Sequence, residues 1–250
     1  MKASLAPHRS SVYRYLSLAF ADPQAAQLAE LRREVAGLES DLRTLGDAVA
    51  LAQARAWRTL LPRLRPRRWL AAHVQCFGHA ISKECPPYAA EYDQANLFQK
   101  TQTLADIAGF YRAFGLQTAP ALHERADHVS VELEFMHFLC LKEAHAAERG
   151  EASDRAAQCR AAQAKFLGQH LATWTRGFAQ RLAVVAGEGP YRSLALLLEA
   201  FVAAEAARLE VPEGGGGRLN EAPEASDGAC AARCGAPAAA GGSEVNHACI

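Results

Sequence analysis

The segments between residues 9 and 209 have the composition of helices, and this property constrains the fold more than any other. Alanine and leucine dominate these segments, and no runs of β-branched residues stand between hairpin turns. The pattern predicts helices at about 9–21, 24–37, 41–61, 67–83, 94–116, 128–148, 153–187 and 190–209. Prolines explain several breaks, because Pro62 and Pro66 bracket a short stop and Pro120 ends a later segment. We therefore expect an all-α helical bundle.

The composition changes after Val211. Four consecutive glycines at 214–217 open a Gly/Ala/Pro/Ser-rich stretch with almost no large apolar residues. Such a stretch cannot bury enough apolar surface to offset the entropy lost on ordering. We expect a helical domain at 1–210 and a flexible, disordered tail at 211–250.

Charge and hydropathy exclude several classes of protein. Lys+Arg and Asp+Glu number 27 each, so no overall positive charge favours DNA as a partner. Residues 1–20 lack the apolar core of a signal peptide, and no window reaches the roughly 18 uncharged apolar residues of a membrane span. We expect a cytoplasmic protein without a membrane span. Seven cysteines, an odd number, favour reduced thiols over a disulfide framework.

The stretch 124–141 joins acids and histidines to the start of an apolar helix. One face is expected to be buried, because apolar residues recur there at helical spacing, namely Val129, Leu133, Met136 and Cys140. Asp127 precedes this run, where an N-cap residue would accept a hydrogen bond from a free backbone N–H. His128 and Glu132 are one turn apart and are expected to interact on the helix surface.

Two interpretations of this stretch stay open. It is either a capped helix with a solvated surface pair or a recognition site for a cationic partner segment. In the second interpretation the apolar face lines a groove for an amphipathic peptide. The acids that would meet the partner's cations are Glu124, Asp127, Glu132 and Glu134.

A second motif, Pro86-Pro87-Tyr88-Ala89-Ala90-Glu91-Tyr92, lies upstream. The prolines predict an extended connector, and Tyr88 and Tyr92 share a face if a helix starts here. Tyrosines with an apolar ring and a polar tip suit half-buried or interface positions. The alternative is a rigid turn with both rings packed on the core.

Taken together, the two motifs resemble a known family. Pro-Tyr-x-x-x-Tyr followed by Glu-Arg-x-Asp-His-x-x-x-Glu-Leu-Glu-Phe is similar to the TorD/DmsD/NarJ-like redox-enzyme maturation chaperones. The resemblance covers residues 10–209, with its core at 86–141. It implies an all-α, non-catalytic chaperone of the TorD-like type. The implied partners are the apo catalytic subunit of a molybdopterin oxidoreductase of the DMSO-reductase type and its N-terminal, often twin-arginine, leader.

The resemblance also implies roles for individual residues. Asp127 and His128 match the family's Asp-His pair, which is implicated in leader binding, and Tyr88 and Tyr92 match its tyrosine motif. Such a chaperone requires no cofactor of its own. It would hold the subunit until cofactor insertion and assembly are complete and so delay export. Long helices with apolar faces permit either a monomer or a domain-swapped dimer.

Metal chemistry offers the alternatives. Glu134-x-x-His137 is half of a di-iron motif, but the second match, Glu244-x-x-His247, lies in the tail, and residues 153–187 contain no glutamate. The tail also carries four soft ligands that could bind zinc or an iron–sulfur cluster, namely Cys230, Cys234, His247 and Cys249. The alternative function is that of a metal-binding accessory protein that uses this tail.

Residues 48–83 contain basic residues and no acid. The Arg65-Pro-Arg-Arg-Trp69 segment could bind phosphate or nucleic acid, because guanidinium groups suit phosphate oxygens, or it could be a solvated loop that balances nearby acids. Four large side chains are expected in the core, namely Phe135, Phe138, Trp174 and Phe178, together with Cys140.

Overall fold

The computed structural model describes residues 4–78, 84–92, 97–117, 124–148 and 153–212, and every regular element within these ranges is a helix. The all-α prediction is confirmed. These residues belong to a compact unit, Met1–Asn220. The predicted metal ligands Cys230, Cys234, His247 and Cys249 lie outside the described residues, as does the tail in which they stand. The boundary at residue 210 between domain and tail stays a prediction.

Prolines and one glycine divide the first half of the chain. The elements are α1 (Ala6–Phe20), α2 (Ala25–Leu45), α3 (Ala48–Leu60), the 3₁₀ turn η1 (Leu61–Arg63) and α4 (Pro66–Phe77). As expected, Pro62 lies in the short stop and Pro66 opens the next helix. The predicted break between residues 37 and 41 is wrong. The helix continues to Gly46, which ends it with φ 76° and donates its N–H to the carbonyl of Arg43.

The second half contains the candidate site. Its elements are the 3₁₀ turn η2 (Ala89–Glu91), α5 (Leu97–Ala113), α6 (Val129–Glu148), α7 (Ser153–Phe166), the π-helix η4 (Leu167–Leu171), α8 (Ala172–Val185) and α9 (Pro190–Arg208). The helix predicted at 153–187 is continuous, but one turn of it is widened into the π-helix, where His170 is buried. Such π turns inside α-helices are rare.

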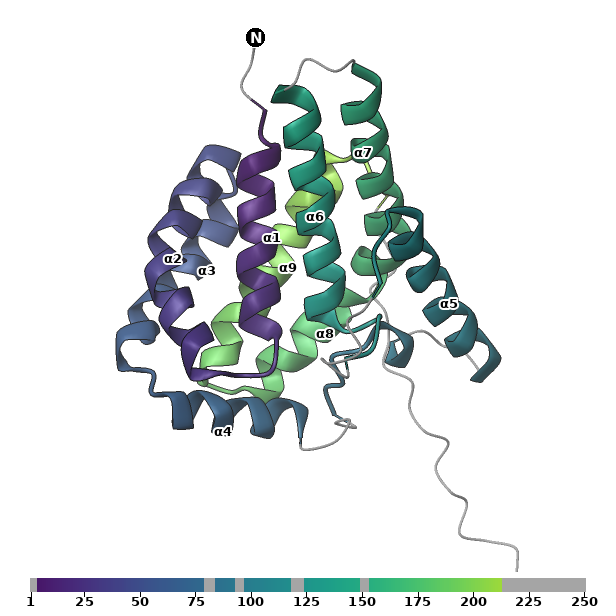
Figure 1. The fold of residues 1–250 in the computed structure, drawn as a ribbon. Helices are drawn as coiled ribbons and strands as arrows, with labels where there is room; N and C mark the ends of the chain where they lie inside the picture. The colour runs from purple at the N-terminus through teal and green to yellow at the C-terminus, as the bar shows by residue number, and fades with distance from the viewer. Residues whose placement is uncertain (1–3, 79–83, 93–96, 118–123, 149–152, 213–250) are drawn as a thin grey trace, which may run out of the picture. The chain divides into compact units, whose positions relative to one another are not determined.

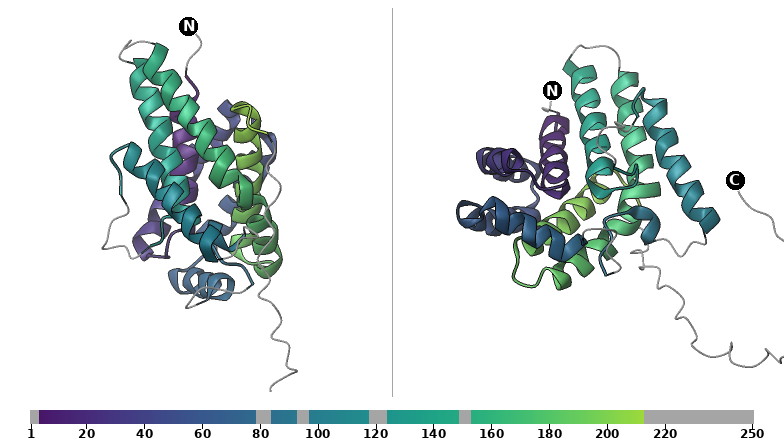
Figure 2. Two further views of the ribbon diagram at one scale, coloured as in Figure 1. Left: turned by 90° about the vertical axis from the view of Figure 1, so that its right-hand side faces the viewer. Right: turned by 60° about the horizontal axis from the view of Figure 1, so that its bottom comes forward.

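Contacts between elements distant in sequence build the core. Helix α1 contacts α6, α2 and α9, and α9 also contacts α3, α4 and α8. In Figure 1, α1 lies between α2 and α6, and the views in Figure 2 agree that α5 and the α2–α3 pair lie on opposite sides of α6. The expected burial of Phe135, Trp174, Phe178 and Cys140 is confirmed, whereas Phe138 is only partly buried.

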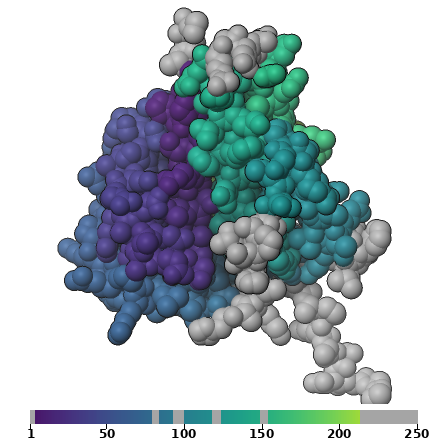
Figure 3. Space-filling model, viewed as in Figure 1, coloured from purple at the N-terminus to yellow at the C-terminus, as the bar shows by residue number. Residues whose placement is uncertain are grey.

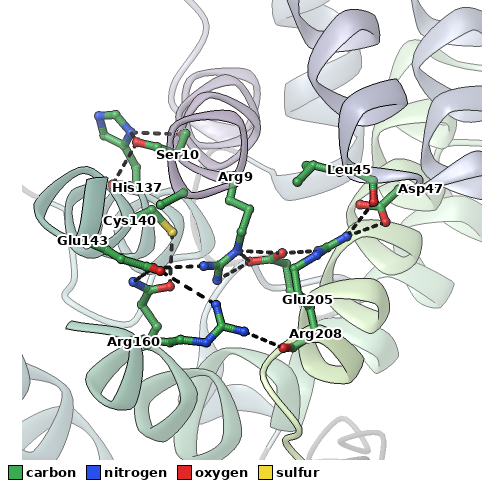
Figure 4. Close-up of polar contacts among 12 residues, drawn as sticks. Arg9, Ser10, Leu45, Asp47, His137, Cys140, Glu143, Arg160, Glu205 and Arg208 are labelled. Atoms are coloured by element: carbon green, nitrogen blue, oxygen red, sulfur yellow. Dashed lines mark hydrogen bonds and ion pairs between the residues drawn. The ribbon is translucent and has the colours of Figure 1, made fainter. Parts of the chain in front are cut away.

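A charged cluster inside this core joins the first and last helices. The guanidinium group of Arg9 on α1 donates from Nε to both carboxylate oxygens of Glu205 on α9, at 3.0 and 2.8 Å. Arg9 also lies 3.2 Å from Glu143 on α6, and Arg208 binds both Glu205 and Asp47 (Figure 4). Arg9 and Glu205 are 1% and 0% exposed, so each charge depends on its partners.

The other observations on the fold concern thiols and membranes. Four cysteines of the described ranges have buried side chains, namely Cys76, Cys85, Cys140 and Cys159. Burial raises the pKa of Cys76 to about 11 and that of Cys85 to about 12. Among the described helices none is long and apolar enough to cross a membrane.

Candidate functional site

Residues 87–89 and 127–129 lie more than thirty positions apart in the sequence and pair as short stretches of extended backbone. We call this pairing the junction. The N–H of Ala89 donates to the carbonyl of Asp127 at 2.9 Å, and the N–H of Val129 donates to the carbonyl of Pro87 at 2.9 Å. Tyr88 and His128 form an isolated antiparallel bridge between these bonds. The predicted extended connector is confirmed, and it brings the tyrosine motif directly onto the Asp-His motif.

The Asp127 side chain closes this junction rather than capping a helix. Its Oδ2 accepts the N–H of Ala90 at 3.1 Å, and Arg125 donates to both of its carboxylate oxygens, at 2.9 and 2.8 Å. The predicted N-cap role is therefore wrong. At the start of α6, the ring of His128, the residue before the helix, accepts the Ser130 N–H at 3.2 Å. Asp127 is fully buried, so its charge relies on these donors.

Arg125 links the junction to two groups nearer the surface, Tyr88 and Glu91. It lies 4.4 Å from the centre of the Tyr88 ring and 3.4 Å from Glu91, which also pairs with Lys100 at 2.7 Å. The Tyr88 hydroxyl donates to Glu124 at 3.2 Å. Burial, helped by Glu124, raises the pKa of Tyr88 to about 12. The hydroxyl therefore stays protonated and keeps its hydrogen bond at neutral pH.

The predicted surface interaction between His128 and Glu132 is wrong, because both side chains are buried, at 4% and 0% exposure. Burial, followed by the charge of Arg125 among other groups, lowers the pKa of His128 to about 3. Burial raises the pKa of Glu132 well above its ordinary value, and the Trp174 indole donates to its Oε2 at 3.3 Å. Neither group can meet a cationic partner from this position.

The two motif tyrosines do not share a face, because a 3₁₀ turn rather than an α-helix separates them. Tyr88 is half-buried at the surface, whereas Tyr92 is 2% exposed and lies 5.4 Å from Trp174 and 6.1 Å from Phe178, measured between ring centres. The alternative in which a tyrosine packs on the core is thus correct for Tyr92. Its pKa is raised, chiefly by burial.

A groove opens beside this junction, between the end of α5 and the outer face of α6. Its volume is about 380 Å³, and apolar side chains form most of its wall, namely Tyr111, Leu116, Val131, Phe135, Phe138 and Leu141. Two of the predicted acids, Glu124 and Glu134, line it as well. Figure 3 shows this face, on which α6 runs between α1 and α5. We call it the α6 groove.

The structure thus sorts the predicted residues into three groups. Glu124 and Glu134 line the α6 groove, Tyr88, Asp127 and His128 form the junction beside it, and Tyr92 and Glu132 lie in the core, where both contact Trp174. The sequence did not predict that Phe138 and Leu141 line a groove. Their spacing from Glu134, four and seven residues, marks a second face of the helix that could have been recognised.

No group of three His, Cys, Asp or Glu side chains within the described part of the chain could hold a metal ion. Among these residues, the di-iron half-motif at Glu134 and His137 finds no further ligands. His137 instead contacts α1, with its Nδ1 2.8 Å from the Ser10 hydroxyl.

Comparisons with known proteins identify the family of this chain. Residues 44–180, more than half of the chain, match the family described as nitrate reductase delta subunit. The chain is 30% identical over 118 residues to the chaperone protein TorD of Vibrio cholerae serotype O1, covering 46% of this chain and 50% of that protein. It is 40% identical over 90 residues to the perchlorate reductase assembly chaperone protein of Dechloromonas aromatica, covering 35% and 39%.

The selenate reductase assembly chaperone protein of Thauera selenatis is 38% identical over 106 residues, which cover 42% of this chain and 52% of that protein. The chain thus spans about half the length of these curated relatives, or less. The aligned family region contains both motifs and the start of α6. The chain therefore belongs to the nitrate reductase delta subunit family, the TorD/NarJ-like maturation chaperones that its motifs resemble.

Proposed function

We propose that this protein is a cytoplasmic, non-catalytic chaperone for one molybdopterin oxidoreductase of the DMSO-reductase type. It binds the N-terminal leader and the apo catalytic subunit, and it assists cofactor insertion and assembly before export. The names of three relatives, a TorD chaperone and two reductase assembly chaperones, support the class of partner.

The observation that carries the proposal is the α6 groove. A leader peptide joins positive charge to an apolar stretch, so its receptor needs acids beside an apolar surface. Glu124 and Glu134 supply the acids, and Phe138 and Leu141 supply part of the apolar wall. Leu141 is 52% exposed and so presents apolar surface at the groove that a peptide could cover.

The junction positions the groove rather than binding the leader's charges. Asp127 is buried and holds Arg125 and the Ala90 N–H, while Tyr88 holds the carboxylate of Glu124. A substitution at Asp127 would therefore act on leader binding through Arg125 and Glu124. This indirect role of Asp127 is consistent with its match to the family's Asp-His pair. It differs from the expectation that Asp127 itself contacts a cation of the leader.

The test starts from the client. Gentle purification of the tagged protein from its host, followed by mass spectrometry, should recover one molybdenum-enzyme catalytic subunit. A labelled peptide with that subunit's leader sequence should then bind, as measured by fluorescence anisotropy. We expect Glu124→Gln with Glu134→Gln to weaken binding about tenfold, since charged pairs at interfaces contribute on the order of 1–2 kcal/mol. Leu141→Asp should weaken it at least as much.

Matched controls stand on other elements. Glu188→Gln removes an exposed acid between α8 and α9, and Val184→Asp changes an apolar side chain on α8 that is 79% exposed. Both should leave the affinity for the peptide unchanged. The proposal is wrong if the leader peptide does not bind, or if the groove variants bind it as tightly as these controls do.

A further inference from the structure

Four arginines stand at the turn between α3 and α4, outside the site described above. Arg63 ends η1, and Arg65, Arg67 and Arg68 stand at the start of α4. All four are exposed, and within the described residues none of them forms an ion pair. Arg58 nearby does find an acid, Glu39 at 3.1 Å. We call these four residues the arginine corner.

The backbone of this corner is held firmly, so the arginines project from a fixed scaffold. Leu61, Leu64 and Trp69 are buried, at 1%, 8% and 1% exposure, and they anchor the turn in the core. Arg32 on α2 donates to the carbonyl of Leu61 at 3.1 Å and to that of Leu64. The apolar residues therefore point inward, and the intervening arginines face solvent.

This charge distribution is unfavourable for the isolated chain. Pro66 is the first residue of α4, so Arg65, Arg67 and Arg68 surround the positive end of the helix dipole. The stretch 48–83 offers no acid to compensate. An anionic partner would relieve this repulsion and gain three or four guanidinium contacts.

Two exposed leucines accompany the arginines. Leu60 and Leu70, at 38% and 46% exposure, flank the arginines in the sequence. Arginine beside exposed apolar side chains is typical of protein interfaces. Binding of single-stranded nucleic acid by base stacking is disfavoured, because Trp69 is buried and cannot stack on a base.

We infer that the arginine corner docks a carboxylate-rich surface of the client's catalytic subunit, apart from the leader. This inference rests on the proposed function, which supplies a large protein partner. The corner and the α6 groove share no residue, and α4 contacts α8 and α9, whereas the groove is formed by α6 and the end of α5. Two separate contacts with one client raise the overall affinity without enlarging either site.

The experiment compares the leader peptide with the full-length apo catalytic subunit. The variants are Arg63→Gln with Arg65→Gln, and Arg67→Gln with Arg68→Gln. Each should weaken binding of the subunit about tenfold, more at low salt, and should leave peptide binding within about twofold. The charge-matched control, Arg33→Gln with Arg43→Gln, removes two exposed arginines of α2 and should change neither affinity.

The outcomes separate the two proposals. If the corner variants bind the subunit as the wild-type protein does, the docking surface is refuted, while leader binding at the groove stands. If the wild-type protein binds the subunit through the corner but never binds the peptide, the proposed leader site fails instead. Binding of phosphatidylglycerol vesicles or single-stranded DNA that the corner variants lose, with subunit binding unchanged, would also overturn the inference.

Discussion

At the scale of single residues, burial decides the chemistry of the site. Glu132 was expected to meet a cationic partner, yet it is fully buried, and its Oε2 accepts the Trp174 N–H. A carboxyl group without a cation in such a position favours its neutral form. Glu134, two residues later, is exposed and lines the α6 groove.

This burial predicts a pH dependence of stability. Burial raises the pKa of Glu132 above 4.5, so above that pH the folded state retains a proton that the unfolded state loses. The free energy of unfolding should therefore fall as the pH rises above 4.5, by about 1.4 kcal/mol per pH unit, until the pH reaches the pKa of Glu132 in the folded protein. Glu132→Gln removes this dependence. Urea unfolding at pH 4.5 and pH 8 should show that the stability of the variant relative to the wild-type protein increases as the pH rises.

Glu148→Gln provides the comparison, because Glu148 is exposed at the end of the same helix. Its free energy of unfolding should change between pH 4.5 and pH 8 by the same amount as that of the wild-type protein. A Glu132→Gln variant that runs parallel to the wild-type protein between pH 4.5 and pH 8 would show that Glu132 is ionised in the folded protein.

At the scale of elements, helix α2 shows what a single glycine decides. Its leucines remain buried past the predicted break, with Leu38 at 3% and Leu42 at 0% exposure, so the helix continues. Gly37 lies inside it with open space around its Cα, whereas Gly46 ends it with a positive φ. Gly37 and Ser40, residue types that are common at helix ends, concealed this difference in the sequence.

The two glycines should respond in opposite directions to the same change. Gly37→Ala should stabilise the protein by about 0.5–1 kcal/mol, because alanine loses less entropy in a helix. Gly46→Ala should destabilise it by about 1–2 kcal/mol, because a Cβ is strained in the left-handed region. Thermal unfolding of both variants checks this pair, and equal signs would contradict the assigned end of α2.

At the scale of the whole helical unit, the Arg9–Glu205 pair joins residues 196 positions apart in sequence. Removing one partner leaves the other charge buried, so Arg9→Met should cost about 3–5 kcal/mol. Adding Glu205→Met should recover part of this loss, giving a coupling energy of about 1–3 kcal/mol in a double-mutant cycle. Urea unfolding of the four proteins measures it.

Arg14→Met supplies the contrast on the same helix, because Arg14 pairs with Glu34 at the surface and is 44% exposed. This substitution should cost less than about 1 kcal/mol. Strictly additive effects of Arg9→Met and Glu205→Met would mean that the buried pair does not couple α1 to α9.

The sequence by itself determined the class of fold and most helix boundaries. Helical spacing and prolines act over a few residues, so Pro66 and the buried face of Val129, Leu133, Met136 and Cys140 could be recognised without the structure. The two motifs also indicated the family, because the identity and order of their residues can be seen in the sequence alone.

Only the tertiary structure decided which acids reach solvent. Asp127 binds the Ala90 N–H 37 residues away, and Glu132 meets Trp174 42 residues away, while Glu124 and Glu134 stay beside the groove. Burial of a carboxyl group depends on neighbours brought in by packing, and local spacing carries no information about them. The same holds for the α6 groove, which exists only because the end of α5 folds back against α6.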